Sequence, residues 1–143
     1  MKSPIRYELV ATAPSGARAA VLHTRRGQTL LPTFMPVATH AHVRGLTMDE
    51  VADSGATICL ANTYHLLLRP GADVFNRFGD VHRYMKWDGG VLTDSGGFQI
   101  FSLPGARDIT ENGARFRSPY DNHAHLLSPE SSIEMQQAIG SDI

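Results

Sequence analysis

Residues 91–101 read Val-Leu-Thr-Asp-Ser-Gly-Gly-Phe-Gln-Ile-Phe. An apolar run that ends in a carboxylate and two glycines predicts a buried strand followed by a tight turn. Asp94 would then lie at the carboxyl end of the strand, where parallel α/β folds gather their binding and catalytic groups. Gly96 and Gly97 would let a ligand approach the main chain closely. The alternative is an Asp-Ser-Gly-Gly β-turn on the surface, because short motifs of this kind also arise by chance.

A second polar group follows the apolar run at residues 57–61, which also predicts a buried strand. This group contains Asn62 and His65. Because the carboxyl ends of parallel strands meet at one face, we expect both side chains on the same face as Asp94. The alternative is that residues 62–65 form only a polar loop end and the start of a helix.

Metal chemistry has weaker support in these residues. His40 and His42 have a spacing that suits metal ligands, but no third ligand pairs with them. Cys59 is the single cysteine and lies in an apolar run, which predicts a buried small side chain. No Cys-x-x-Cys pair exists, so no zinc site is expected within this chain.

The composition is that of a globular domain. The chain has 143 residues, of which 42% are hydrophobic and 19% charged. Its formal net charge of -1 neither suggests nor excludes a nucleic-acid partner, because a local basic patch can be hidden in a neutral total. No signal-peptide pattern and no long apolar window occur, so we expect a soluble cytoplasmic protein without a membrane partner.

The order of elements predicts a parallel α/β fold. Extended segments are expected at residues 6–12, 18–23 and 29–31, joined by hairpins. Further strands are expected at residues 34–38, 57–61 and 91–94, with Pro36 placing the first of them at an edge. Helical segments alternate with these strands, which favours a parallel sheet.

The helix ends carry recognisable signals. Thr47 and Glu50 have the spacing of a capping box, and Gly55 would end that helix. Ser128 followed by Pro129 predicts another helix start. Helical stretches are also expected after Pro70 and over 81–87, and a hairpin about residues 119–122 is expected within 105–127. Apolar helix residues predicted as core are Val74, Phe75, Phe78, Trp87 and Ile133.

Four stretches together carry a resemblance, because they occur in the order and spacing of one family. They are Phe-Met-Pro-Val-Ala-Thr at 34–39, Asn-Thr-Tyr-His-Leu and Leu-Arg-Pro-Gly within 62–71, Leu-Thr-Asp-Ser-Gly-Gly-Phe-Gln at 92–99, and Gly-Ser-Asp-Ile at 140–143. The chain closely resembles the N-terminal part of the tRNA-guanine transglycosylase (queuine tRNA-ribosyltransferase) family. The resemblance covers nearly the whole chain.

The resemblance implies a fold. It is the N-terminal portion of a (β/α)8 TIM barrel with a β-rich N-terminal extension. Residues 1–32 would form the hairpin extension, and residues 33–143 the first barrel strands and helices, with a hairpin insertion near 105–127. The segments at 34–38, 57–61 and 91–94 would be the first three barrel strands.

The resemblance also implies a reaction and roles for particular residues. The family exchanges the wobble guanine of certain tRNA anticodons for a 7-deazaguanine, which is preQ1 in bacteria, through a covalent aspartyl-ribose intermediate. Asp94 matches the family's proton acceptor and also binds substrate. Ser95, Gly96, Gly97 and Phe98 complete the matching substrate-binding segment, with Phe98 stacking on the base. The functional interpretation of Asn62 places it near the ribose or the nucleophile.

Other parts of the family pattern have no matching position here. These are the nucleophilic aspartate and the ligands of a structural zinc ion (Zn2+), three Cys and one His. Asp142 matches the start of the fourth barrel strand and is not the nucleophile. We therefore expect a fragment that does not turn over alone, and a homodimer for the intact protein. Arg115 and Arg117 are candidates for tRNA phosphate contacts.

Two other functions remain as alternatives. One is a non-catalytic accessory subunit of the same family that binds tRNA or a catalytic partner. The intact segment at residues 94–97 argues against it, because such a subunit has no chemical need for a base-binding turn. The other is a different barrel enzyme that acts on a sugar or nucleobase. Replacing Asp94 by Ala separates the first from an enzyme, since only an enzyme would lose exchange.

Overall fold

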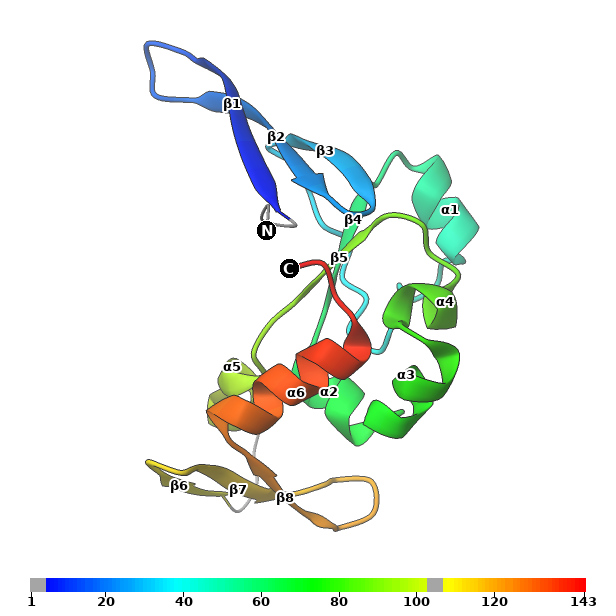
Figure 1. The fold of residues 1–143 in the computed structure, drawn as a ribbon, viewed down its shortest axis with the longest axis vertical. Helices are drawn as coiled ribbons and strands as arrows, with labels where there is room; N and C mark the ends of the chain where they lie inside the picture. Colours follow the sequence, from blue (N-terminus) through cyan, green and yellow to red (C-terminus); the bar gives the residue numbers. More distant parts are fainter. Residues whose placement is uncertain (1–4, 103–106) are drawn as a thin grey trace.

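The computed structural model describes residues 5–102 and 107–143, and it arranges them in three regions. A three-stranded antiparallel sheet lies at one end, a central α/β region follows, and a second three-stranded sheet lies at the other end (Figure 1). The central region carries the candidate site, and the two outer sheets flank it.

The N-terminal sheet contains β1 (Arg6–Thr12), β2 (Arg18–Thr24) and β3 (Gly27–Leu31). The strands pair antiparallel in chain order, which confirms the predicted hairpins. β3 starts two residues earlier than expected, because Gly27 already pairs with Thr24 across the turn. Every residue of β1 is exposed, so the sheet contributes little to the core.

Two parallel strands form the centre of the molecule. β4 (Ile58–Ala61) and β5 (Gly90–Thr93) pair in register from Ile58 opposite Gly90 to Ala61 opposite Thr93. Both strands are largely buried, as continuous apolar runs predict. The expected strands at 57–61 and 91–94 are thus confirmed to within one residue at each end.

Chain segments flank this pair on both sides. On the β4 side, the expected strand at 34–38 is wrong in extent, because only Val37 forms a parallel bridge, to Leu60. Pro36 has no N–H to donate, so it contributes only a carbonyl, which accepts from Leu60 N at 3.0 Å. On the β5 side, Asp142 N donates to the Val91 carbonyl at 2.8 Å. The result is a mixed α/β fold, and the described residues contain no closed barrel.

Local signals explain the helix boundaries. Thr47 caps α1 (Met48–Asp53) through the predicted capping box, with Glu50 N donating to Thr47 Oγ1 at 3.2 Å. Ser128 caps α6 (Pro129–Ile139), and Gly140 ends it in the left-handed conformation, as predicted. The remaining helices are α2 (Thr63–Leu68), α3 (Ala72–Phe78), α4 (Val81–Met85) and α5 (Gly97–Ser102).

The polar segment after α5 forms a sheet rather than a simple hairpin. Its strands are β6 (Arg107–Thr110), β7 (Gly113–Arg117) and β8 (Ala124–Leu127), paired antiparallel. The turn at residues 118–123 between β7 and β8 matches the expected hairpin, whereas β6 was not predicted. Its four residues include Asp108 and Thr110 and give no apolar alternation to read. Residues 105 and 106 of the predicted insertion lie outside the described residues.

The core prediction is right in part. Phe75 and Trp87 are buried, but Phe78 is 49% and Ile133 55% exposed, and Val74 is half-buried. Phe78 is the last residue of α3 and lies past the buried Phe75 on the same side of the helix, where its ring meets the Tyr84 ring edge-on with 5.4 Å between the ring centroids. Cys59 is fully buried as expected, and burial raises the pKa of its thiol to about 11. No helix among the described residues is long and apolar enough to cross a membrane.

Candidate functional site

Asp94 is held at the carboxyl end of β5 by three N–H donors. Asn62 Nδ2 donates to Asp94 Oδ2 at 2.6 Å, and the Thr63 and Gly96 amides donate to Oδ1 at 2.9 and 3.2 Å. The side chain is half-buried. The predicted meeting of Asn62 and Asp94 is therefore confirmed, because both follow adjacent parallel strands.

α2 fixes the main chain of the same residue. Asn62 is the residue that precedes α2, and the Thr63 hydroxyl donates to the Asp94 carbonyl oxygen. Asn62 and Thr63 thus both bind the Asp94 carboxylate, and Thr63 also binds its main-chain carbonyl. This arrangement leaves the carboxylate little rotational freedom and makes its direction a property of the fold.

The turn after Asp94 requires glycine at one position. Gly96 has a φ of 80°, and a Cβ placed there would lie 3.1 Å from Tyr64 N and 3.3 Å from Leu127 Cδ2. α6 supports the same turn, because Ser132 Oγ donates to the Ser95 carbonyl at 2.8 Å. Gly97 starts α5, and its amide donates to Ser95 Oγ at 3.4 Å. Only Gly96 is buried, against α2 and β8, whereas Ser95 and Gly97 are exposed, so the turn lies partly at the surface and is more than a simple surface β-turn.

Phe98 projects from the first turn of α5 and is 72% exposed. Nothing in the described core needs this ring, and Phe101 on the same helix is 73% exposed. An apolar cavity of about 540 Å³ is lined by Phe101 and borders Ser95 and Gly97, whereas the Phe98 ring lies outside its lining. The exposed Phe98 ring, four residues after the fixed carboxylate, is available to a planar ligand.

His65 lies one turn along α2 from Asn62. Its ring meets His40 edge-on at 4.9 Å, and His42 Nδ1 donates to the His40 carbonyl at 3.2 Å. Burial lowers the pKa of His65, the neighbouring His40 lowers it further, and Asp94 opposes both effects. Among the described residues, no group of three or more His, Cys, Asp or Glu side chains is placed to hold a metal ion.

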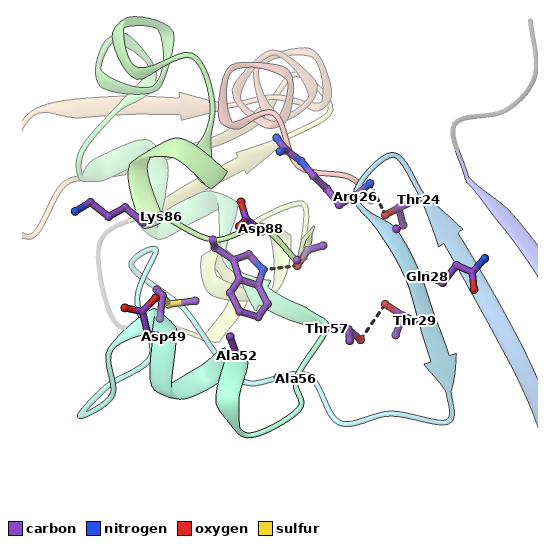
Figure 2. Close-up of a pocket in the computed structure, with 15 residues that line it drawn as sticks. Thr24, Arg26, Gln28, Thr29, Asp49, Ala52, Ala56, Thr57, Lys86 and Asp88 are labelled. Carbon is purple, nitrogen blue, oxygen red and sulfur yellow. Dashed lines mark hydrogen bonds between the residues drawn. The ribbon is translucent and has the colours of Figure 1, made fainter.

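A second cavity, of about 320 Å³, lies at the opposite end of β4 and β5. Figure 2 shows it between the β2–β3 hairpin, α1 and the Trp87 segment, with Thr57 donating to Thr29 at 3.1 Å. Its charged side chains carry both signs: Arg26 and Lys86 against Asp49 and Asp88. Asp88 and Asp94 thus lie just before and just after the same strand.

Two residues of the Asp94 site were not predicted. Thr63 contributes both its amide and its hydroxyl, and only its place after Asn62 hinted at a role. Ser132 carries no sequence signal, since a serine within a helix usually faces solvent or its own backbone. Both are found only when the packing of α2 and α6 against the turn is known.

Comparison with known proteins gives a family for this constellation. Residues 13–143 match the Queuine tRNA-ribosyltransferase family. The chain belongs to this family. Proteins of that name from Symbiobacterium thermophilum, Anoxybacillus flavithermus and Geobacillus kaustophilus are 54%, 50% and 49% identical to it, over 140, 142 and 144 residues.

These queuine tRNA-ribosyltransferases are longer than the present chain. The matches cover 97%, 99% and 100% of this chain but 35%, 38% and 38% of the three relatives. The family resemblance of the sequence is therefore confirmed.

Proposed function

We propose that the protein is a tRNA-guanine transglycosylase that exchanges the wobble guanine of tRNA for a 7-deazaguanine. The observation that carries the proposal is the Asp94 carboxylate, fixed by Asn62, Thr63 and Gly96 and followed four residues later by the exposed ring of Phe98 on α5. A base-exchange site needs a proton acceptor of fixed direction and a surface for a planar base. This segment provides both.

The chemistry assigns Asp94 a limited task. In the first displacement a carboxylate bonds to ribose C1′ as the bond to guanine breaks, and the departing guanine takes up a proton from solvent. In the second, the incoming base loses a proton to Asp94, bonds to C1′ and displaces the carboxylate. The two displacements retain the configuration at C1′. The nucleophile is expected outside these residues, because the family's aspartate has no matching position among them.

The neighbouring residues receive roles from the same geometry. Phe98 stacks on the base, an interaction worth about 1–3 kcal/mol per base in nucleic-acid complexes. Gly96 and Gly97 let the base lie close to the main chain, and Ser95 shapes the turn. Asn62 orients Asp94 and lies near the ribose. Arg115 and Arg117 are both exposed on β7, which suits contact with tRNA phosphates.

Further proposals concern the whole protein. They are preQ1 as the incoming base, a homodimer as the working form, and the cytoplasm as its location. The family's Zn2+ site does not fit the described residues, which contain no group placed to hold a metal ion. No step proposed here runs through zinc.

The test is exchange of radiolabelled guanine into unmodified tRNA that carries guanine at the wobble position. It is run with this chain alone and with a completed protein, in which the chain is fused to the part of the Symbiobacterium relative that it does not match. We expect exchange only by the completed protein, and loss of it in Asp94→Asn. Asp88→Asn is the matched control, because Asp88 is exposed and precedes the same strand.

Each result has a distinct meaning. Exchange that survives Asp94→Asn would overturn the role of Asp94. A completed protein that binds this tRNA but never exchanges its base would favour the non-catalytic accessory subunit. Exchange by the chain alone would place the nucleophile within these residues.

A further inference from the structure

A second aspartate, Asp142, is more deeply buried than Asp94 and has no part in the proposed chemistry. Its side chain is 1% exposed. Arg25 Nε donates to Oδ1 at 2.7 Å, while His82 Nε2 and the Val91 amide donate to Oδ2 at 2.8 and 2.9 Å. Burial by itself raises the pKa of this carboxyl, but the bonds from His82, Arg25 and Val91 outweigh it and lower the pKa to about 2.

The three donors come from three separate parts of the chain. Arg25 lies in the turn between β2 and β3, His82 on α4 and Val91 on β5. Arg25 also donates to the carbonyl of Gly140, and Thr93 pairs its hydroxyl with Ser141 Oγ at 2.8 Å. One carboxylate therefore joins the N-terminal sheet, a helix and the strand that carries Asp94.

The backbone around Asp142 binds the same strand. Asp142 N donates to the Val91 carbonyl at 2.8 Å, and Thr93 N donates to the Ile143 carbonyl at 2.9 Å. The side chain of Asp142 thus closes a ladder between residues 141–143 and β5. This ladder fixes the position of β5 along its own axis.

That axial position matters at the other end of β5. Asn62 follows β4 and Asp94 follows β5, and their 2.6 Å hydrogen bond bridges the two strand ends. A shift of β5 along β4 by roughly 1–2 Å would lengthen this bond beyond its normal range. The distance from Val91 to Asp94 is three residues, or roughly 10 Å of strand.

We infer that Asp142 is a positioning residue, which through β5 fixes the Asp94 carboxylate against Asn62 and Thr63. This inference rests on the proposed function for its catalytic meaning, but its geometry can be tested without catalysis. In this role Asp142 contacts no substrate. Asn at this position would keep the volume but set an NH2 group against one of three N–H donors.

The first experiment uses Asp142→Asn in the 143-residue chain and follows amide signals by NMR. The Thr63 and Gly96 amides report on Asp94, because both donate to its carboxylate. We expect their hydrogen-exchange rates to rise about tenfold, as for a hydrogen bond weakened by 1.4 kcal/mol. The matched control is Asp121→Asn, an exposed carboxylate with its own hydrogen bonds, which should leave both amides unchanged.

A second variant covers the case in which Asp142→Asn does not fold. Arg25→Gln removes one donor whose side chain is half exposed, so the core around Asp142 stays closed. It should perturb the same two amides in the same direction and by a smaller factor. If both amides keep their wild-type exchange rates in every variant that folds, the inference is wrong.

The second experiment uses base exchange by the completed protein. Asp142→Asn should lower kcat at least tenfold with KM for tRNA unchanged within about twofold, because the base-stacking and phosphate contacts remain. A purely structural role would instead reduce only the amount of folded enzyme, and kcat per folded molecule would stay constant. If the wild-type protein shows no exchange at all, the proposed function fails while the amide experiment still tests the positioning.

Discussion

The two ends of β5 each hold an aspartate with three hydrogen-bond donors, and the two sites are built differently. Asp142 is 1% exposed and receives an arginine, a histidine and one amide. Asp94 is half-buried and receives only neutral N–H groups. A buried carboxylate paired with a guanidinium stabilises structure, whereas a partly exposed carboxylate held by neutral donors can exchange protons with a ligand. We infer from this comparison that donor type and access, not donor number, separate the structural carboxylate from the one proposed for chemistry.

The largest expected effect is on stability and concerns Asp142. Asp142→Asn should lower the free energy of unfolding by about 3–5 kcal/mol, because it leaves buried donors without their acceptor. Asp94→Asn should lower it by less, about 1–3 kcal/mol, because the Asn oxygen can still accept from the neutral amides, although Thr63 and Gly96 are buried. Urea unfolding followed by circular dichroism measures both. Equal losses would erase the distinction between the two sites.

A smaller effect is expected at the turn beside Asp94. Gly96→Ala should destabilise the protein by about 1–3 kcal/mol, since it adds both left-handed strain and a close contact with Tyr64. Gly45→Ala is the matched control, because Gly45 has a nearly equal φ of 82° but no atom within 4 Å of a new Cβ. The difference between the two variants in thermal or urea unfolding isolates the contact. A Gly45→Ala loss as large as that of Gly96→Ala would mean that the turn is not tightly enclosed.

A comparable effect concerns ligand binding rather than stability. Phe98→Ala should leave the unfolding free energy nearly unchanged, because the ring is 72% exposed. In the completed protein it should weaken binding of the base by about 1–3 kcal/mol through the loss of stacking. Phe101→Ala, equally exposed on the same helix, is the control and should retain affinity. Calorimetric titration with a 7-deazaguanine distinguishes the two, and equal losses would show that the rings act only as a general apolar surface.

The smallest expected effect is on how the free energy of unfolding depends on pH. The pKa of Asp142 lies near 2, below its usual 3.8, so its stabilising contribution is complete above about pH 4. The contribution is lost as the pH falls from 4 through 2, where the folded state must take up a proton. Asp142→Asn should remove this part of the pH dependence, as seen by comparing unfolding free energies at pH 5 and pH 3. A variant with the wild-type slope would indicate that other carboxylates govern acid unfolding.

Local signals in the sequence predicted much of the fold. Capping residues located the ends of α1 and α6, and apolar runs located β4 and β5 within a residue. The prediction failed where local pattern and tertiary contact disagree. Pro36 reduced an expected strand to a single bridge, and Phe78 is exposed because it is the last residue of a short helix. β6 was not predicted because its four residues show no apolar alternation.

The candidate site was predictable where it lies on one continuous motif. Asp94 and its glycine turn could be named from residues 91–101, and Asn62 from its place after the neighbouring strand. Ser132 could not be named, because its donor role depends on how α6 crosses the turn. Asp142 was recognised as part of a strand start. Its role as a buried acceptor of three hydrogen bonds was not predicted, because the three donors are distant in sequence.

The bond between Arg25 and Asp142 joins residues 117 positions apart. During synthesis the N-terminal hairpin therefore emerges from the ribosome long before its anchoring carboxylate. At about 5–20 residues per second, the delay is roughly 6–23 s. Over that interval the exposed strand edges of β1 and β3 have no attachment through Asp142 to the rest of the molecule. We expect nascent chains halted before residue 142 to bind chaperones through this hairpin, and to release them once Asp142 is available.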